Sequence, residues 1–312
     1  MIEIELISLV AFLLIAFSIG SNDTSNAFGI CIGCRIISVR KSIIPLFALV
    51  LIGALFQGDR VVKTVGYELV ATSVQISAVA LIISAVIIVI ANIRGLPVST
   101  HQVIVGSLFG SGVAFGTSVS VETLSKIVLS WLLSPFISGF LAILVFLSIE
   151  KFLRHYNFLQ VEKILKSLLL CSAVVIAYNM GANELATAIA PIARSRDYHS
   201  IAFLGAISVS IGAFTLSRRI AETLCKGITT LDPKSGLSAH FGAGLAVYLF
   251  TILGMPVSAT YSLVGGITAV GLLKGVRTVK FRVLKRIALN WAFAPILAFI
   301  LSSIASKIYL WI

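Results

Sequence analysis

Ten long apolar runs, separated by short polar segments, are the feature that most constrains the fold of this chain. The runs are continuous and do not alternate with polar residues, which favours membrane helices over the strands of a barrel. Charged residues make up 12% of the 312 residues, about half of the roughly 25% usual in soluble proteins, so a soluble fold of this size would lack a polar surface. We therefore predict an all-α polytopic membrane protein with about 10–12 membrane segments. The runs lie near residues 5–20, 42–57, 74–93, 97–113, 126–149, 167–180, 200–216, 237–253, 256–273 and 287–310.

The flanks of these runs indicate how the chain crosses the membrane. Several runs are shorter than the roughly 20 residues that a straight span needs, or contain Gly and Pro, which predicts broken or re-entrant helices. No basic residue precedes the first run, whereas Arg35, Arg40 and Lys41 follow it, and four basic residues lie in the segment 151–166. Because cytoplasmic segments carry the excess of Lys and Arg, we expect a cell-membrane protein with both termini outside and a cytoplasmic linker at 151–166. The lipid bilayer is then its main partner, and nothing resembles the recognition helix or stacking platform of a nucleic-acid-binding protein.

Blocks of similar residues recur between the two halves of the chain at offsets of 159 to 161 residues. A repeated offset of this kind indicates a duplication. Each half holds five apolar runs, and an odd number makes the second copy enter the membrane from the opposite side. We therefore expect two inverted-topology repeats, 1–150 and 167–312, with a binding site at their interface near mid-membrane. The matching blocks are Gly53-Ala54 with Gly212-Ala213, Arg60 and Thr64 with Arg219 and Thr223, Gly95 to Ser99 with Gly254 to Ser258, Trp131 and Pro135 with Trp291 and Pro295, and Asn22-Asp23 with Asn183-Glu184.

Two polar segments, 20–27 and 181–188, interrupt the apolar pattern at equivalent positions and carry Asp23 and Glu184. An unpaired charge at membrane depth costs roughly 2.5–3.5 kcal/mol on insertion scales, so such a residue usually has a function. A bound cation could neutralise it, and Na⁺ suits the oxygen ligands that Asn and Asp side chains and unwound carbonyls supply. A proton is the alternative partner. The structural alternative is a helix cap in a surface loop.

A second pair of polar segments, 97–101 and 256–260, begins with proline and continues with Ser and Thr. Proline pre-sets the backbone at the start of a helix, where free N–H groups and the positive end of the helix dipole can hold an anion. Two such starts facing each other could hold a tetrahedral oxyanion from both sides. The structural alternative is a proline kink whose hydroxyls bond back to the helix.

These four segments resemble the inorganic phosphate transporter (PiT) family, the type III cation-coupled phosphate symporters. The family carries a Gly-Ala-Asn-Asp-Val-Ala-Asn motif in each repeat, followed by a Pro-Val/Ile-Ser-Ser/Thr-Thr-His motif. The resemblance implies which positions contact the substrate and which the cation. The substrate positions are Asp23, Ser99, Thr100, His101, Glu184, Ser258, Ala259 and Thr260, and the cation positions are Asn22, Asp23, Asn26, Asn183, Glu184 and Thr187. If the cation is Na⁺, the resemblance places the metal on Asp23, Asn26, Asn183 and Glu184.

The chain departs from the family motifs at several of these positions. Glu184 replaces an aspartate, Thr187 replaces the second asparagine and Ala259 replaces a hydroxyl residue. His101 stands in the place of the final threonine, so a role in proton coupling and a packed, hydrogen-bonded role are both open. The second-repeat site could therefore differ from the family in cation stoichiometry or in anion choice.

The sequence thus indicates a secondary transporter that imports inorganic phosphate with Na⁺ or H⁺. With a negative cell interior, each negative charge that enters costs roughly 2.3 kcal/mol per 100 mV, and a coupled cation cancels that cost. The alternatives are a sulfate permease, an anion channel, which would need a continuous polar pore, and a membrane-embedded enzyme, for which the scattered histidines offer no constellation. We expect no enzyme activity and no cofactor beyond the transported ion, and the resemblance suggests a homodimer.

Overall fold

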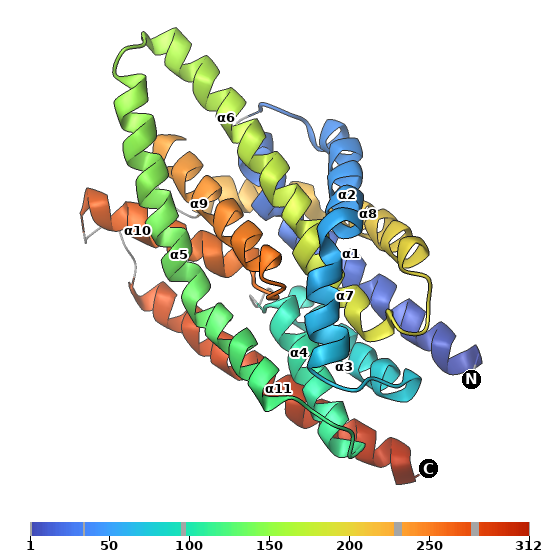
Figure 1. Ribbon diagram of the computed structural model, residues 1–312. Coiled ribbons are helices and arrows are strands. Elements are labelled where there is room, and N and C mark those ends of the chain that lie inside the picture. Colours follow the sequence, from blue (N-terminus) through green and yellow to red (C-terminus); the bar gives the residue numbers. More distant parts are fainter. Residues whose placement is uncertain (1, 34, 95–97, 228–232, 276–280, 312) are drawn as a thin grey trace.

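The computed structural model is built of helices and describes residues 2–33, 35–94, 98–227, 233–275 and 281–311. Within these ranges the only extended pairing is one isolated bridge between Val70 and Val119. In chain order the elements are α1 (Ile2–Gly33), α2 (Val39–Lys63), η1 (Thr64–Glu68), α3 (Val74–Ile93), α4 (Thr100–Ala114), α5 (Val121–Leu153), α6 (Phe158–Asn179), η2 (Met180–Leu185), α7 (Ala186–Ile189), η3 (Ala190–Ile192), α8 (Tyr198–Gly227), α9 (Pro233–Ile252), α10 (Ala259–Lys274) and α11 (Phe281–Trp311). Helices remote in sequence lie side by side, such as α11 beside α4 (Figure 1).

Among the described residues, eight helices are long and apolar enough to cross a membrane. All ten apolar runs of the sequence fall on helices, and the two that do not reach spanning length are α4, with 15 residues, and α10, with 16. At 1.5 Å per residue a helix of this length covers only about 24 Å, less than the roughly 30 Å of hydrocarbon. Eight full spans and two short helices therefore account for the ten apolar runs of the sequence.

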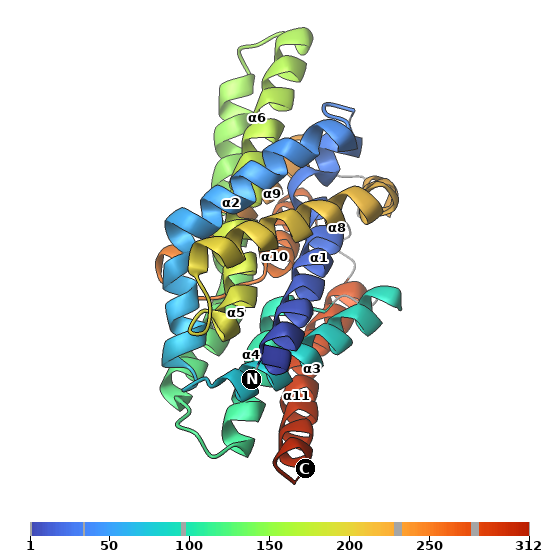
Figure 2. The same ribbon diagram turned by 90° about the vertical axis from the view of Figure 1, so that its right-hand side faces the viewer.

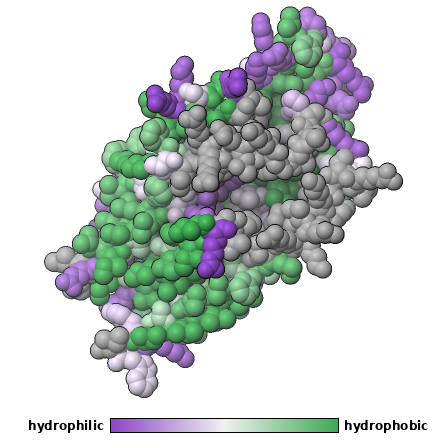
Figure 3. All heavy atoms as spheres, turned by 180° about the vertical axis from the view of Figure 1, so that it is seen from behind, coloured by the Kyte–Doolittle hydropathy of each residue, from purple (hydrophilic) through white to green (hydrophobic). Residues whose placement is uncertain are grey.

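Large apolar side chains face outward over much of the surface. Phe56 is 79% exposed and Phe136 is 77% exposed. Figure 3 shows the hydrophobic residues spread over the body of the molecule and the hydrophilic ones gathered toward its ends. Such an apolar surface is far larger than soluble monomers tolerate, and it fits contact with lipid. The protein is therefore a multi-pass membrane protein.

The first polar segment does not break a helix, contrary to our expectation for residues 20–27. Helix α1 runs without interruption from Ile2 to Gly33. Two of its polar side chains, Asn22 and Asn26, bond to residues of other helices while the backbone stays helical. The second polar segment does distort the backbone: its first residues lie in the π-helical turn η2, which continues α6 and leads into the short helix α7.

The two proline-led segments do begin helices, as the sequence predicts. Ser99 precedes α4 with φ −84° and ψ 121°, and Ser258 precedes α10 with φ −83° and ψ 124°. Both residues are extended in nearly the same way, and neither side chain caps its own helix. Pro97 lies outside the described residues, whereas Pro256 lies in the loop before α10.

Glycines allow pairs of helices to pack backbone to backbone, and these contacts come in matching pairs. A Cβ at Gly53 on α2 would lie 2.0 Å from the Tyr178 carbonyl oxygen, and one at Gly212 on α8 would lie 2.1 Å from that of Phe17. Gly106 on α4 approaches the backbone of Pro295 on α11, and Gly265 on α10 approaches that of Pro135 on α5. The partners within each pair of contacts are separated by the same 159 to 161 residues as the sequence blocks.

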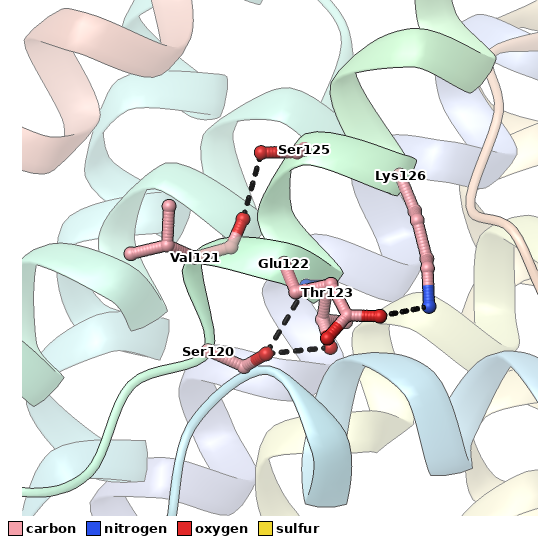
Figure 4. Close-up of polar contacts among 6 residues, drawn as sticks. All are labelled: Ser120, Val121, Glu122, Thr123, Ser125 and Lys126. Carbon is pink, nitrogen blue, oxygen red and sulfur yellow. Dashed lines mark hydrogen bonds and ion pairs between the residues drawn. The ribbon is translucent and has the colours of Figure 1, made fainter.

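Helices α5 and α6 form a long hairpin that projects beyond the rest of the molecule (Figures 1 and 2). Helix α5 begins after Ser120, whose side chain accepts a hydrogen bond from the Thr123 N–H at 3.1 Å. One turn further, Lys126 donates to Glu122 at 2.6 Å (Figure 4). This charged first turn marks the end of α5 opposite to the hairpin tip.

Candidate functional site

Asn26 on α1 links the first polar segment to the start of α10. Its side-chain amide donates to the Asp23 carboxylate at 3.0 Å and to the Thr260 hydroxyl at 2.9 Å. The Thr260 hydroxyl is also a hydrogen-bond partner of Asp23. Asn26 is 8% exposed. Three oxygen- and nitrogen-bearing side chains from two helices thus form one connected group.

Asn183 plays the corresponding part for the second polar segment. Its amide donates to the Thr251 hydroxyl at 2.7 Å and to the Met255 carbonyl at 3.0 Å, and its oxygen accepts from the Val257 N–H at 3.0 Å. Asn183 is fully buried in η2. These bonds satisfy the polar groups of the loop between α9 and α10, and they hold the start of α10 against η2.

Glu184 and Asp23 bring two carboxyl groups together from opposite halves of the chain. Glu184 is 3% exposed, and its carboxylate interacts electrostatically with that of Asp23. One Glu184 oxygen accepts from the Ala259 N–H, whereas Oε2 has no hydrogen-bond partner among the described residues. Among the residues that the structure describes, neither carboxyl group forms an ion pair with Lys or Arg.

Two interacting carboxylates, one buried and one half-buried, need a cation or protons to be stable here, because neither has a basic partner among the described residues. The groups around them are side-chain amides, hydroxyls and helix-end N–H groups. The oxygens can coordinate a hard cation such as Na⁺, and the N–H groups can donate to an anion. The cluster therefore offers ligands for both charges of an ion pair.

The predicted substrate positions at the starts of α4 and α10 lie in the interior, except Thr260, which is half-buried. Ser99, Thr100 and His101 are 5%, 8% and 2% exposed, and Ser258 and Ala259 are 6% and 5% exposed. His101 lies within hydrogen-bonding reach of Asn183, which joins α4 to η2. Its Nε2 atom has no hydrogen-bond partner among the described residues. Ala259, which lacks a hydroxyl, contributes its backbone N–H to Glu184.

Two predicted cation positions point elsewhere. Asn22 donates to the side-chain oxygen of Asn92 at the end of α3. The Thr187 hydroxyl donates to the Asn183 carbonyl of its own helix at 2.8 Å. Thr187 thus supports the backbone that carries Asn183, while Asn22 ties α1 to α3.

The structure adds contacts around the site that the sequence alone does not show. His240 on α9 is 1% exposed, and its ring contacts the Asn26 carbonyl and, at 2.8 Å, the Ser172 hydroxyl. The Tyr261 hydroxyl donates to Gln102, so the first turns of α10 and α4 touch. Gln102 and Tyr261 both stand in the place of the histidine that ends the family's proline-led motif, and they are separated by the repeat offset of 159 residues.

A helical membrane fold that encloses such a polar cluster is that of a membrane transporter. Comparison with known proteins agrees. A family model described as the phosphate transporter family matches residues 19–302. The chain belongs to the phosphate transporter family.

Relatives and a solved structure match over nearly the whole chain. The protein named "Putative phosphate permease" of Methanocaldococcus jannaschii is 37% identical over 306 residues, which cover 98% of each chain. A protein of the same name from Pyrococcus furiosus is 26% identical and covers 92% of each. A solved structure titled "The sodium-dependent phosphate transporter" superposes with a TM-score of 0.85 at 24% identity, over 99% of this chain and all of that one. The last comparison establishes the fold alone.

Proposed function

We propose that this protein imports inorganic phosphate by symport with a cation, through alternating access at the cluster around Asp23 and Glu184. The observation that carries the proposal is the meeting of these two carboxyl groups beside the start of α10, without a basic partner among the described residues. A phosphate anion could not approach two bare carboxylates, because like charges repel strongly in a medium of low dielectric. The cation therefore binds first and makes the site attractive for the anion.

The proposed cation ligands are Asp23, Asn26, Asn183 and Glu184. Na⁺ is the cation we favour, since the oxygens of these side chains suit it and the superposed transporter is named sodium-dependent. Protons on the same carboxyl groups are the alternative. The links of Asn22 to α3 and of Thr187 to its own helix give these two residues a supporting role.

The proposed phosphate ligands are the starts of α4 and α10. Ser99, Thr100, Ser258 and Thr260 offer hydroxyls, Ala259 offers backbone only, and His101 offers an imidazole. Phosphate can keep a proton that a carboxylate accepts, whereas sulfate offers only acceptors. The Glu184 Oε2 atom, which has no partner among the described residues, therefore favours phosphate over sulfate.

We further propose that residues 1–150 and 167–312 are inverted repeats, and that one bundle of helices moves against the other to expose the site to each side in turn. The glycine contacts at matching offsets support this relation, because a two-fold axis between the halves would produce equivalent helix pairs. Both views place the two termini at the end of the molecule away from the α5–α6 hairpin (Figures 1 and 2). This supports an arrangement with both termini outside the cell membrane and the linker 151–166 in the cytoplasm. A homodimer stays a prediction.

The test is uptake of labelled phosphate by proteoliposomes. We expect uptake with an inward Na⁺ gradient, little uptake when K⁺ replaces Na⁺ at constant pH, and weak competition by sulfate. Uptake that follows a pH step and ignores Na⁺ would assign the coupling to protons. Flux that needs neither cation would contradict symport and indicate a channel.

Asp23→Asn keeps the shape of the side chain and removes its charge. We expect it to abolish coupled uptake while the protein stays folded and monodisperse. Glu122→Gln is the matched control, because it removes an exposed carboxylate from the far end of α5. Full uptake by Asp23→Asn would contradict the role given to this carboxyl group.

A further inference from the structure

A groove of about 560 Å³ lies between α5 and α6 near the tip of their hairpin. Its walls are apolar: Ile149 and Phe152 come from α5, and Ile164 and Leu168 come from α6. Lys163 provides the only charged side chain of the lining. The groove is remote from the carboxylate cluster, and nothing in the transport mechanism above uses it.

Two serines also line the groove, but their hydroxyls are used within their own helices. Ser148 donates to the Leu144 carbonyl at 2.8 Å, and Ser167 donates to the Lys163 carbonyl at 3.1 Å. The surface of the groove therefore consists of hydrocarbon and of hydroxyls that already donate hydrogen bonds within their own helices. An aliphatic chain fits such a surface, whereas a polar solute would lose hydrogen bonds there.

The position of the groove along α5 places it at the edge of the hydrocarbon layer. Residues 127–149 of α5 carry no charged side chain, and Lys126 and Lys151 flank this stretch. Twenty-five residues of helix separate these two lysines, a rise of about 38 Å, against a hydrocarbon thickness of roughly 30 Å. Ile149 thus lies at the inner end of the apolar stretch, and Lys151 lies at the level of the lipid headgroups.

The rim of the groove is positively charged. Lys151, Arg154 and Lys163 are exposed, and none of them forms an ion pair among the described residues. Lys166 differs, because it pairs with Glu162 at 2.6 Å. Apart from that pair, the hairpin segment 148–168 contains three basic side chains of Lys and Arg and one carboxylate, that of Glu150.

Exposed aromatic side chains surround this rim. Phe158 is 81% exposed, Phe152 is 52% exposed and Tyr156 is 39% exposed. Figure 3 shows hydrophilic and hydrophobic residues side by side at this end of the molecule. Basic and aromatic residues together are typical of the headgroup layer of a membrane.

We propose that this groove binds an anionic phospholipid, with one acyl chain between α5 and α6 and the phosphate facing Lys163. Lys151 and Arg154 add positive charge at the same level and select an anionic over a zwitterionic headgroup. The site bears on transport through its two helices. Trp131 on α5 donates to the Pro256 carbonyl before α10 at 2.7 Å, and α6 continues into η2 with Asn183 and Glu184.

Lipid retention by the purified protein tests the proposal, and it does not depend on the coupling ion. The protein is exchanged into nanodiscs of equal parts phosphatidylglycerol and phosphatidylcholine, and the lipids that stay bound after delipidation are counted by native mass spectrometry. We expect one phosphatidylglycerol molecule retained per chain. The double variant Lys151→Gln/Lys163→Gln should weaken this retention about twenty-fivefold, the product of roughly fivefold for each lysine. Lys126→Gln is the matched control at the opposite end of α5 and should retain lipid as the wild type does.

A second variant tests whether the acyl chain binds in the groove. Ser148→Trp fills the groove from an exposed position and should remove the retained lipid while the protein stays monodisperse. Equal retention of the two lipids, or retention unchanged in the double lysine variant, would overturn the proposal. Retention that depends on the lysines but survives Ser148→Trp would also overturn it, since the headgroup would then bind without the groove. Disulfide cross-linking between two copies through Ser148→Cys, with no lipid retained, would assign the groove to a dimer interface instead.

Discussion

The close packing of Gly181 against α2 makes a single methyl group a severe perturbation of the candidate site. A Cβ at Gly181 would lie 1.9 Å from the Val50 carbonyl oxygen and 2.8 Å from the Ala54 nitrogen. These are backbone atoms, so no side-chain rotation can make room. To reach an ordinary contact of 3.4 Å, η2 and α2 must separate by about 1.5 Å, and overpacking of this kind costs roughly 1–3 kcal/mol.

The displacement reaches the site because Asn183 and Glu184 lie two and three residues after Gly181 in η2. The three hydrogen bonds of Asn183 are 2.7–3.0 Å long, and a shift of more than 1 Å would break them. We therefore expect Gly181→Ala to lower the midpoint of thermal unfolding in detergent by several degrees and to abolish phosphate uptake in proteoliposomes. Gly20→Ala should act alike on the first polar segment, since its Cβ would lie 1.8 Å from the Val209 oxygen.

Gly236→Ala is the control for these two variants. Gly236 lies in α9 with no atom within 4 Å of an added Cβ, so alanine should leave stability unchanged or raise it slightly. Wild-type thermal stability and uptake in Gly181→Ala would refute the packing argument. An equal loss in Gly236→Ala would show that the cost comes from any helical glycine and not from the close approach.

Three further substitutions test single contacts. Glu184→Gln should abolish coupled uptake yet raise the unfolding temperature in Na⁺-free buffer, because it removes one of two facing carboxylates; a lower temperature would contradict their repulsion. Thr251→Val should destabilise the protein by about 1–2 kcal/mol in chemical or thermal unfolding and weaken uptake, since it removes a 2.7 Å partner of Asn183; unchanged stability would exclude a role for this bond. Asp197 accepts a hydrogen bond from the Ser200 N–H at the start of α8, and this bond lowers the pKa of the Asp197 carboxyl group. The ionised carboxylate therefore stabilises the fold at any pH above the usual pKa of aspartate. This stabilisation is lost as the pH falls through the lowered pKa. The difference in unfolding temperature between the wild type and Asp197→Ala should therefore shrink on acidification, and a constant difference would contradict the linkage.

The helices and the starts of α4 and α10 could be predicted from the sequence because their signals are local. A continuous apolar run defines a membrane helix by itself, and Pro followed by Ser defines a helix start within a few residues. Asp23 and Glu184 could be singled out for the same kind of reason, since each is a charge placed next to a long apolar run. The expectation that these two residues meet came from the repeated offset, because equivalent positions of two repeats can meet at the interface between them.

The continuity of α1 could not be predicted, because it depends on contacts that are remote in sequence. A run of small and polar residues such as 20–27 is compatible with a break until the partners of its side chains are known. Asn26 bonds to Thr260 across 234 positions, and His240 contacts its carbonyl across 214. Only the packing of α1 against α9 and α10 decides that these polar groups are satisfied with the helix intact.

The division of the cluster between the halves has a consequence for coupling. Asp23 is carried by α1 and Glu184 by η2, so the two carboxyl groups belong to different elements of the proposed site. On the proposed mechanism, two ionised carboxylates without a cation repel each other and oppose closure of the site, whereas a cation between them favours closure. Phosphate would then bind to the cation-loaded site beside the start of α10. Coupling by this mechanism needs no separate gate, since closure of the site and binding of phosphate both depend on the bound cation.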